Sequence, residues 1–197
     1  MNTIFFYDTE TTGMPDWSVP SDSDTQPHLV QLAGILCNAE TREVISTMDV
    51  IIKPNGWIIP QETIDVHGIS QEFAEANGID ELEAVQQLLA MAEGANRVAH
   101  NRTFDQRIIR IAMKRYGLSE EALEAWAEKD NHECTMLKAK PIMQLPGKGK
   151  AFKNPTLAEA FMHFTGEELQ GAHTAMGDAK GCMAVYWAMC DLEKVPS

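Results

Sequence analysis

The stretch "TIFFYDTE", residues 3–10, decides the fold class of this chain. It is a continuous apolar run with aromatic and β-branched residues, which is typical of a central strand covered on both faces. The run ends at Asp8, and Glu10 follows two positions later, so both carboxylates point to the same side of the strand. We therefore expect a buried strand whose end carries two acidic side chains that one metal ion could contact.

Three more apolar stretches predict strands at residues 28–37, 43–54 and 95–101, and antiparallel pairing of the first three strands is the most economical topology. Ser70 and Asp80 are expected helix caps, and Thr156 with Glu159 has the spacing of a capping box. With no internal repeat or linker, the pattern predicts one α/β domain over residues 1–197. Helices are predicted at residues 69–77, 80–93, 103–117, 119–129, 134–139, 157–166 and 172–192.

The formal net charge of −13 alone argues against a nucleic-acid partner, but the distribution of charge changes that argument. Most basic residues gather in two short stretches, and the second of them, residues 138–153, contains no acid. The stripe of Arg107, Arg110 and Lys114 points away from Asp105 on a helical wheel, so we interpret it as a solvated face. The two basic stretches contain Arg97, Arg102, Arg107, Arg110, Lys114 and Arg115, and Lys138, Lys140, Lys148, Lys150 and Lys153.

The four cysteines are widely spaced and show no zinc-binding or paired arrangement, so we expect reduced thiols. No apolar run approaches the ~20 residues that span a bilayer, and the N-terminus lacks a basic segment before its apolar run. We therefore expect a cytoplasmic protein with no membrane partner.

Two predicted helices carry a carboxylate on an otherwise apolar stripe. Asp178 shares its face with Cys182 and Val185, and Asp105 shares its face with Ile108 and Ile109. Burying an ionised carboxylate without a partner costs several kcal/mol, and a helix dipole offsets only about 0.3–1 kcal/mol. A lone acid of this kind is more often a cap or an ion-pair partner.

Four acids in such positions favour a metal site. Carboxylate clusters without nitrogen or sulfur ligands suit Mg²⁺ or Mn²⁺, and two such ions about 3.5–4 Å apart can clamp an in-line phosphoryl displacement.

Three motifs carry a resemblance to a known family: "YDTETTG" at residues 7–13, "VAHNRTFD" at 98–105 and "HTAMGD" at 173–178. In order and spacing they resemble the motifs of the DEDDh, or DnaQ-like, family of 3′–5′ exonucleases. The resemblance implies a ribonuclease H-like fold with a mixed five-stranded sheet flanked by helices. It also implies two divalent metal ions, Mg²⁺ or Mn²⁺, and no organic cofactor.

By the same resemblance, the metal-binding acids are Asp8, Glu10, Asp105 and Asp178, and His173 is the general base. A histidine five residues before the last aspartate is the DEDDh spacing, whereas the DEDDy branch has a tyrosine four residues before it. Thr174 occupies that position here.

The resemblance also places residues beside the scissile end of a strand. Met14 would be an apolar wedge against bases, with capping of the core as the alternative, and Asn101 would either hydrogen-bond the strand or cap the following helix. Hydroxyl and backbone groups that could hold the terminal nucleotide are those of Thr9, Thr11, Thr12 and Gly13. Two departures from the family are the long acidic segment 14–27 and the pair Arg102–Thr103, where small residues are common.

The lysine-rich segment 138–153 contains two prolines and two glycines and is predicted to be a loop. We expect Lys148, Lys150 and Lys153 to hold the substrate strand, with a solvated linker as the alternative.

These features predict a metal-dependent 3′–5′ exonuclease that releases nucleoside monophosphates from a free 3′ end, preferably of single-stranded DNA. One alternative is an RNA-trimming exoribonuclease. Another is a catalytically silent nucleic-acid-binding module, against which the five intact motif residues argue. The chain stops soon after its last predicted helix, so we expect no polymerase-tethering tail; the sequence leaves the protein partners open.

Overall fold

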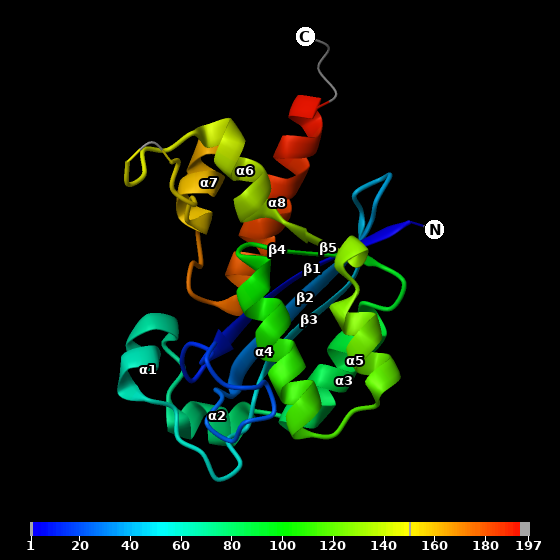
Figure 1. The fold of residues 1–197 in the computed structure, drawn as a ribbon, viewed down its shortest axis with the longest axis vertical. Helices are drawn as coiled ribbons and strands as arrows, with labels where there is room; N and C mark the ends of the chain where they lie inside the picture. The colour runs from blue at the N-terminus through cyan, green and yellow to red at the C-terminus, as the bar shows by residue number, and fades with distance from the viewer. Residues whose placement is uncertain (1, 150, 194–197) are drawn as a thin grey trace.

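The computed structural model describes residues 2–149 and 151–193. Its centre is a five-stranded sheet in the order β3-β2-β1-β4-β5 (Figure 1). The first three strands pair antiparallel, as predicted, and β4 and β5 join the sheet in parallel. The strands are β1 Thr3–Thr11, β2 Leu29–Asn38, β3 Val44–Ile51, β4 Asn96–Ala99 and β5 His132–Cys134.

Helices occupy most of the remaining chain. Ser70 accepts a hydrogen bond from the backbone N–H of Phe73, Asp80 accepts two such bonds, and Thr156 and Glu159 form the predicted capping box. The α-helices are α1 Gln61–His67, α2 Gln71–Asn77, α3 Glu81–Met91, α4 Arg102–Arg115, α5 Glu120–Ala127, α6 Thr135–Met143, α7 Leu157–Thr165 and α8 Ala175–Glu193.

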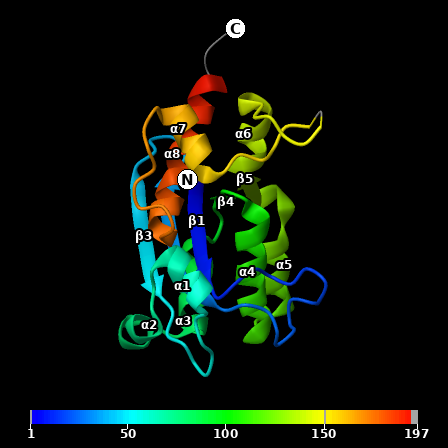
Figure 2. The same ribbon diagram turned by 90° about the vertical axis from the view of Figure 1, so that its left-hand side faces the viewer.

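Alternation along β1 explains why its sequence is apolar on both sides. Phe5 and Tyr7 pack in the core shared with α3, α4 and α5, whereas Ile4 and Phe6 pack against α8. Figure 2 shows β1 between α8 on one side and α4 and α5 on the other. The strand is thus covered on both faces, as the opening stretch predicted.

The lysine-rich segment is not a loop over its whole length. Helix α6 continues through Lys138 and Lys140 to Met143 and includes Pro141. Pro141 cannot donate to the carbonyl oxygen of Leu137 and its ring crowds that carbonyl, and the helix ends two residues later at Met143. The non-helical part begins at Gln144 and contains an isolated antiparallel bridge between Pro146 and Phe152.

The described cysteines agree with the expectation of reduced thiols. Cys37, Cys134, Cys182 and Cys190 form no disulfide among the described residues, and the first three are buried. In the part of the chain that the structure describes, no helix has the length and apolar character needed to cross a membrane.

Candidate active site

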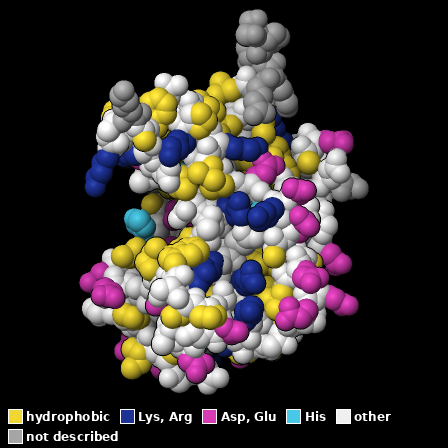
Figure 3. All heavy atoms as spheres, in the orientation of Figure 1, with side chains coloured by type: hydrophobic (Ala, Val, Ile, Leu, Met, Phe, Trp, Pro, Cys, Tyr) yellow, Lys and Arg dark blue, Asp and Glu magenta, His cyan; other side chains and the backbone are white. Residues whose placement is uncertain are grey.

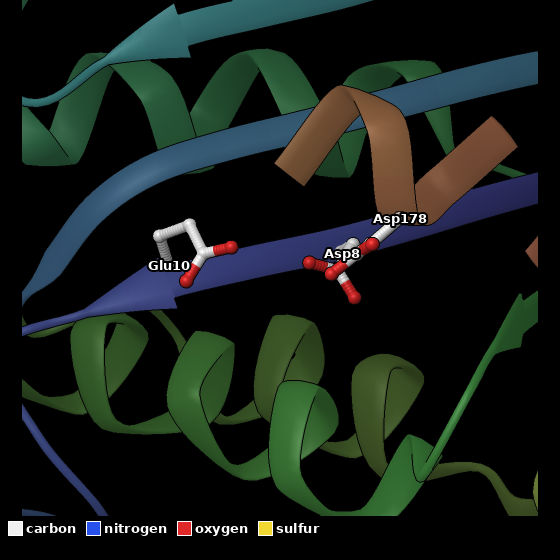
Figure 4. A group of neighbouring side chains, drawn as sticks. All are labelled: Asp8, Glu10 and Asp178. Atoms are coloured by element: carbon white, nitrogen blue, oxygen red, sulfur yellow. The ribbon is translucent and has the colours of Figure 1, made fainter. Parts of the chain in front are cut away.

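Three of the predicted acids converge at the end of β1. Carboxylate oxygens of Asp8, Glu10 and Asp178 lie within 4.8 Å of one another, an arrangement that could hold a metal ion. Figure 4 shows Asp8 and Glu10 projecting from β1 toward Asp178 in the first turn of α8. Both strand carboxylates lie on the face where Phe6 packs against α8, because side chains two positions apart share a face.

The buried stripe of α8 accounts for the position of Asp178. Cys182, Val185 and Met189 are all at most 3% exposed. Asp178 continues this stripe toward the helix N-terminus and meets the strand end, where the facing side chains are carboxylates instead of apolar groups. Its position on an apolar face is therefore a consequence of facing the acids of β1.

Asp105 lies beside this group but is not one of the three. Its side chain, 2% exposed, accepts hydrogen bonds at Oδ1 from the Thr9 backbone N–H (3.1 Å) and the Thr9 hydroxyl (2.8 Å). Thr9 belongs to the opposite face of β1 from Asp8 and Glu10, so it can reach the start of α4. The sequence motif predicts a substrate contact for Thr9, whereas its bond to Asp105 depends on packing between distant segments.

The pKa values of these carboxyl groups are raised. Burial, with the charges of Asp105, Asp178 and Glu10 added, holds the pKa of Asp8 well above its ordinary value. Burial and then the charge of Asp178 raise the pKa of Glu10 to about 7. Burial also raises the pKa of Asp178, and it raises the pKa of Asp105 to about 8 in spite of the bonds from Thr9. Such a set resists full ionisation without a cation, and its oxygen ligands fit a hard divalent ion.

The turn before α8 holds His173 next to Asp178. His173 has a left-handed backbone (φ 65°), its side chain is exposed, and its backbone N–H donates to Asp178 Oδ2 at 3.4 Å. Gly177 permits this turn, because a Cβ at that position would lie 2.0 Å from the carbonyl oxygen of Gly171.

Gln31 fixes the start of α8 to the sheet. This buried side chain accepts a hydrogen bond from the Ala175 backbone N–H (3.0 Å) and donates one to Asp49 Oδ1 (2.7 Å). Gln31 is not among the residues predicted from the sequence, although a lone amide in the apolar run "LVQLAGILC" is a signal for it.

Most of the predicted nucleotide-holding residues lie at the end of β1 and in the turn after it, whereas Asn101 precedes α4. The Thr11 hydroxyl donates to the Gly13 carbonyl oxygen (2.7 Å), and the Thr12 hydroxyl accepts from the His28 backbone N–H (2.9 Å). Met14 is 71% exposed, which removes the alternative that it caps the core. Asn101 is exposed and its side chain makes no cap bond at the start of α4.

The lysines predicted to hold substrate differ in their surroundings. Lys148 is exposed, Lys153 forms an ion pair with Glu159, and Lys150 lies outside the described residues. Earlier in the same segment, Lys138 forms an ion pair with Glu133, and Lys140 donates to the Asn154 side chain.

The interpretation of the α4 stripe as a solvated face is wrong for two of its residues. Arg107 donates from Nη2 to the carbonyl oxygens of Asp16 and Val19, both at 2.9 Å. Lys114 forms an ion pair with Asp22, with 3.7 Å between Nζ and Oδ2. The long segment 14–27 folds back onto α4, a contact that a helical wheel cannot predict. Arg110 is exposed, as expected.

Comparisons with known proteins agree with this geometry. A model of the exonuclease family RNase_T matches residues 5–186. A DNA polymerase III subunit epsilon-like protein of Rhodobacter capsulatus is 34% identical over 109 residues, which are 55% of this chain and 14% of that protein.

Solved structures of exonuclease I have the same fold. One has a TM-score of 0.76 at 19% identity, covering 97% of this chain and 41% of that chain. The E. coli enzyme in complex with a dT13 oligonucleotide has a TM-score of 0.74 at 20% identity and covers 99% of this chain and 41% of its own. This chain thus spans less than half the length of these proteins, and the likeness confirms the predicted ribonuclease H-like sheet flanked by helices.

Proposed function

The chain belongs to the RNase_T exonuclease family, as the resemblance of its three motifs predicted, and from this premise we propose that it removes nucleoside monophosphates from the 3′ end of single-stranded DNA with the help of two divalent metal ions. The observation that carries this proposal is the convergence of Asp8, Glu10 and Asp178 oxygens within 4.8 Å. Their raised pKa values support a cation there, because the cation would remove the mutual repulsion.

In this proposal Asp8, Glu10 and Asp178 hold the metals, with Asp105 as the fourth acid. Mg²⁺ or Mn²⁺ would supply the chemistry of a two-metal phosphodiester hydrolysis, stabilising charge on the attacking and leaving oxygens. Thr9 keeps the Asp105 carboxylate oriented through its two donated bonds.

His173 is the proposed general base. Imidazole accepts and releases protons near neutral pH, and this side chain is exposed beside Asp178. It would accept a proton from the attacking water at a ring nitrogen and return it to solvent. The tight turn over Gly177 limits the freedom of its backbone.

Single-stranded DNA is the proposed substrate for two reasons. The strongly acidic overall charge disfavours long duplex contacts, and the fold relative from E. coli was solved with a single-stranded oligonucleotide. We propose that the terminal nucleotide meets Thr11, Thr12, Gly13, Met14 and Asn101. Lys148 would add a phosphate contact; Lys153 would have to exchange its partner Glu159 for one. We further propose that residues 1–197 act as one domain in the cytoplasm.

A 3′-end digestion panel tests the proposal. Matched DNA and RNA 20-mers labelled at the 5′ end are incubated with Mg²⁺, with Mn²⁺ or with excess chelator. We expect a ladder shortened from the 3′ end only with metal, faster on DNA, and none with Asp178→Asn. The matched control Asp65→Asn, an exposed aspartate on α1, should retain activity.

Each departure from that pattern has a definite meaning. Faster shortening of RNA would establish the exoribonuclease alternative, and shortening in excess chelator would refute the metal mechanism. No shortening of either strand with metal would refute the proposed activity and favour a silent binding module.

A further inference from the structure

A cationic groove lies between α4, the end of α5 and the segment 14–27, which we call the first loop. It encloses about 290 Å³. Its walls include four positively charged side chains and one exposed indole, and no carboxylate side chain lines it among the described residues. These five are Arg102, Arg107, Arg110, Lys129 and Trp17. On a protein of net charge −13, such a concentration of cations needs an explanation.

The charges in this groove are not neutralised by ion pairs within the described chain. Arg102 donates to the neutral Gln106 side chain at 2.7 Å, and Arg107 donates to two carbonyl oxygens. The Nε atoms of both arginines are buried and have no hydrogen-bond partner. Arg110 and Lys129 are exposed, and neither belongs to an ion pair of the described residues. An anion in the groove would supply a counter-charge for Arg110 and Lys129.

Trp17 is held beside these cations by the structure of the first loop. Gln26, only 2% exposed, accepts from the Asp16 backbone N–H and donates to the carbonyl oxygens of Asp16 and Pro20. Trp17 is nevertheless 54% exposed, with the Arg107 guanidinium 4.6 Å from its ring centroid. An indole fixed at the surface next to guanidinium groups is suited to stacking on a nucleobase.

Both walls of the groove are continuous along the chain with elements of the candidate active site. The first loop follows the end of β1 that carries Asp8 and Glu10. Arg102 begins α4 three residues before Asp105, about 4.5 Å along the helix axis. Figure 3 shows basic side chains gathered across α4 in the middle of this face, to one side of a hollow in the molecular surface.

We propose that this groove binds the substrate strand upstream of its 3′ end, with the cations on phosphates and Trp17 on a base. The inference rests on the proposed exonuclease function, since it assigns the rest of the strand whose end is hydrolysed. Basic grooves with exposed aromatic side chains bind single strands because unstacked bases offer their faces. The long first loop, a departure from the family pattern, thereby acquires a role in holding substrate.

Two charge reversals with equal effect on net charge test the groove. Arg110→Glu lies in the groove, and Lys53→Glu changes an exposed lysine that follows β3. Binding of a fluorescent 4-mer and a 20-mer of single-stranded DNA is measured by anisotropy in chelator, where no hydrolysis occurs, over a range of salt. Arg110→Glu should reduce the ratio of 20-mer to 4-mer affinity about tenfold.

The same change should flatten the salt dependence of 20-mer binding by about 0.7 in log–log slope per lost contact. Lys53→Glu should change neither quantity. Lys129→Glu and Trp17→Ala, which act through other atoms of the groove, should each lower the ratio too. Thermal unfolding of every variant checks that the fold is retained.

Equal effects of Arg110→Glu and Lys53→Glu would overturn the proposal, because net charge alone would then explain them. Equal binding of the 4-mer and the 20-mer by the unaltered protein would also overturn it. Since the binding measurement needs no catalysis, a protein that shortens no strand but shows the expected ratios would refute the proposed activity and leave the groove standing. If the protein shortens strands but the groove variants leave the ratio of 20-mer to 4-mer affinity unchanged, the proposed activity stands and the groove proposal is refuted.

Discussion

At the scale of single residues, Thr9 and its two neighbours on β1 contact different acids of the candidate site. Its neighbours Asp8 and Glu10 face Asp178, whereas its own side chain faces Asp105 and donates to Oδ1. Thr9→Val retains the shape of the side chain but removes the hydroxyl donor. We expect a several-fold lower kcat and a higher Mg²⁺ requirement, because a hydrogen bond to a charged group contributes about 1.5–3 kcal/mol.

Thr9→Ser is the matched control for that change, since it keeps the hydroxyl and loses only a methyl group. Steady-state kinetics over a Mg²⁺ titration should give near-normal values for serine and impaired values for valine. Equal impairment of both variants would mean that packing, and not the bond to Asp105, matters at this position.

The raised pKa values of the acids predict a pH dependence of stability. The pKa of Glu10 is about 7 in the folded protein, against an ordinary 4.5, so folding favours its protonated form. This contribution is fully present below about pH 4.5 and is lost as the pH rises through about 7. In chelator, Glu10→Gln should therefore have an increasingly higher Tm than the unaltered protein between pH 5 and 8.

The difference between the two melting curves isolates Glu10 from the other titrating groups. Saturating Mg²⁺ should remove the advantage of the glutamine, because a bound cation compensates the ionised carboxylates. A difference in Tm that does not depend on pH in chelator would contradict the raised pKa.

At the scale of elements, periodicity predicted the parts that bury many residues. The run "TIFFYDTE" predicted β1 and its two carboxylates, and apolar stripes identified Asp105 and Asp178. The three-residue strand β5 and the seven-residue helix α1 were not predicted, because segments so short contain too little periodicity. Contacts between distant segments could not be predicted from the sequence either. These are the bond from Thr9 to Asp105, the bond from Ala175 to Gln31 and the bond from Arg107 to the first loop.

The contact between the turn at Gly171 and the first turn of α8 predicts a sensitive glycine. In Gly177→Ala the new Cβ would meet the carbonyl oxygen of Gly171 at 2.0 Å, so the backbone must move. We expect a loss of about 1–3 kcal/mol in stability and a fall in kcat, because the displaced turn carries His173.

Gly181→Ala is a matched control on the same helix. Its Cβ would meet the end of the flexible Leu169 side chain, which can move. Denaturant unfolding and kinetics should show a much smaller effect there, since alanine also favours the helix. Similar losses for both glycines would indicate that general crowding around α8 is responsible.

At the scale of the whole molecule, one buried glutamate joins the elements that carry the first loop. Glu81 at the start of α3 is 2% exposed and accepts from His28, from the Leu29 backbone N–H, from Arg115 and from Tyr116. Burial alone would raise its pKa, but the bond from His28 and the charge of Arg115 outweigh burial and lower it. Arg115 also donates to the carbonyl oxygens of Gln26 and Pro27, at the end of the first loop.

Glu81→Gln leaves the partly buried Arg115 without its counter-charge while keeping nearly the same volume. Removing one partner of a buried ion pair costs up to about 3–5 kcal/mol, so we expect Tm to fall by as much as roughly 6–20 °C. Glu83→Gln, two residues further along α3 and exposed, should change Tm by less than about 2 °C. Because the pKa of Glu81 is lowered, its contribution is present above about pH 4.5 and is lost on further acidification, so the difference between Glu81→Gln and the unaltered protein should shrink at low pH. A loss that persists unchanged below that pH would mean that the amide disturbs packing rather than charge.

If the network positions the first loop, Glu81→Gln should also weaken binding of the 20-mer more than that of the 4-mer, although residue 81 does not line the groove.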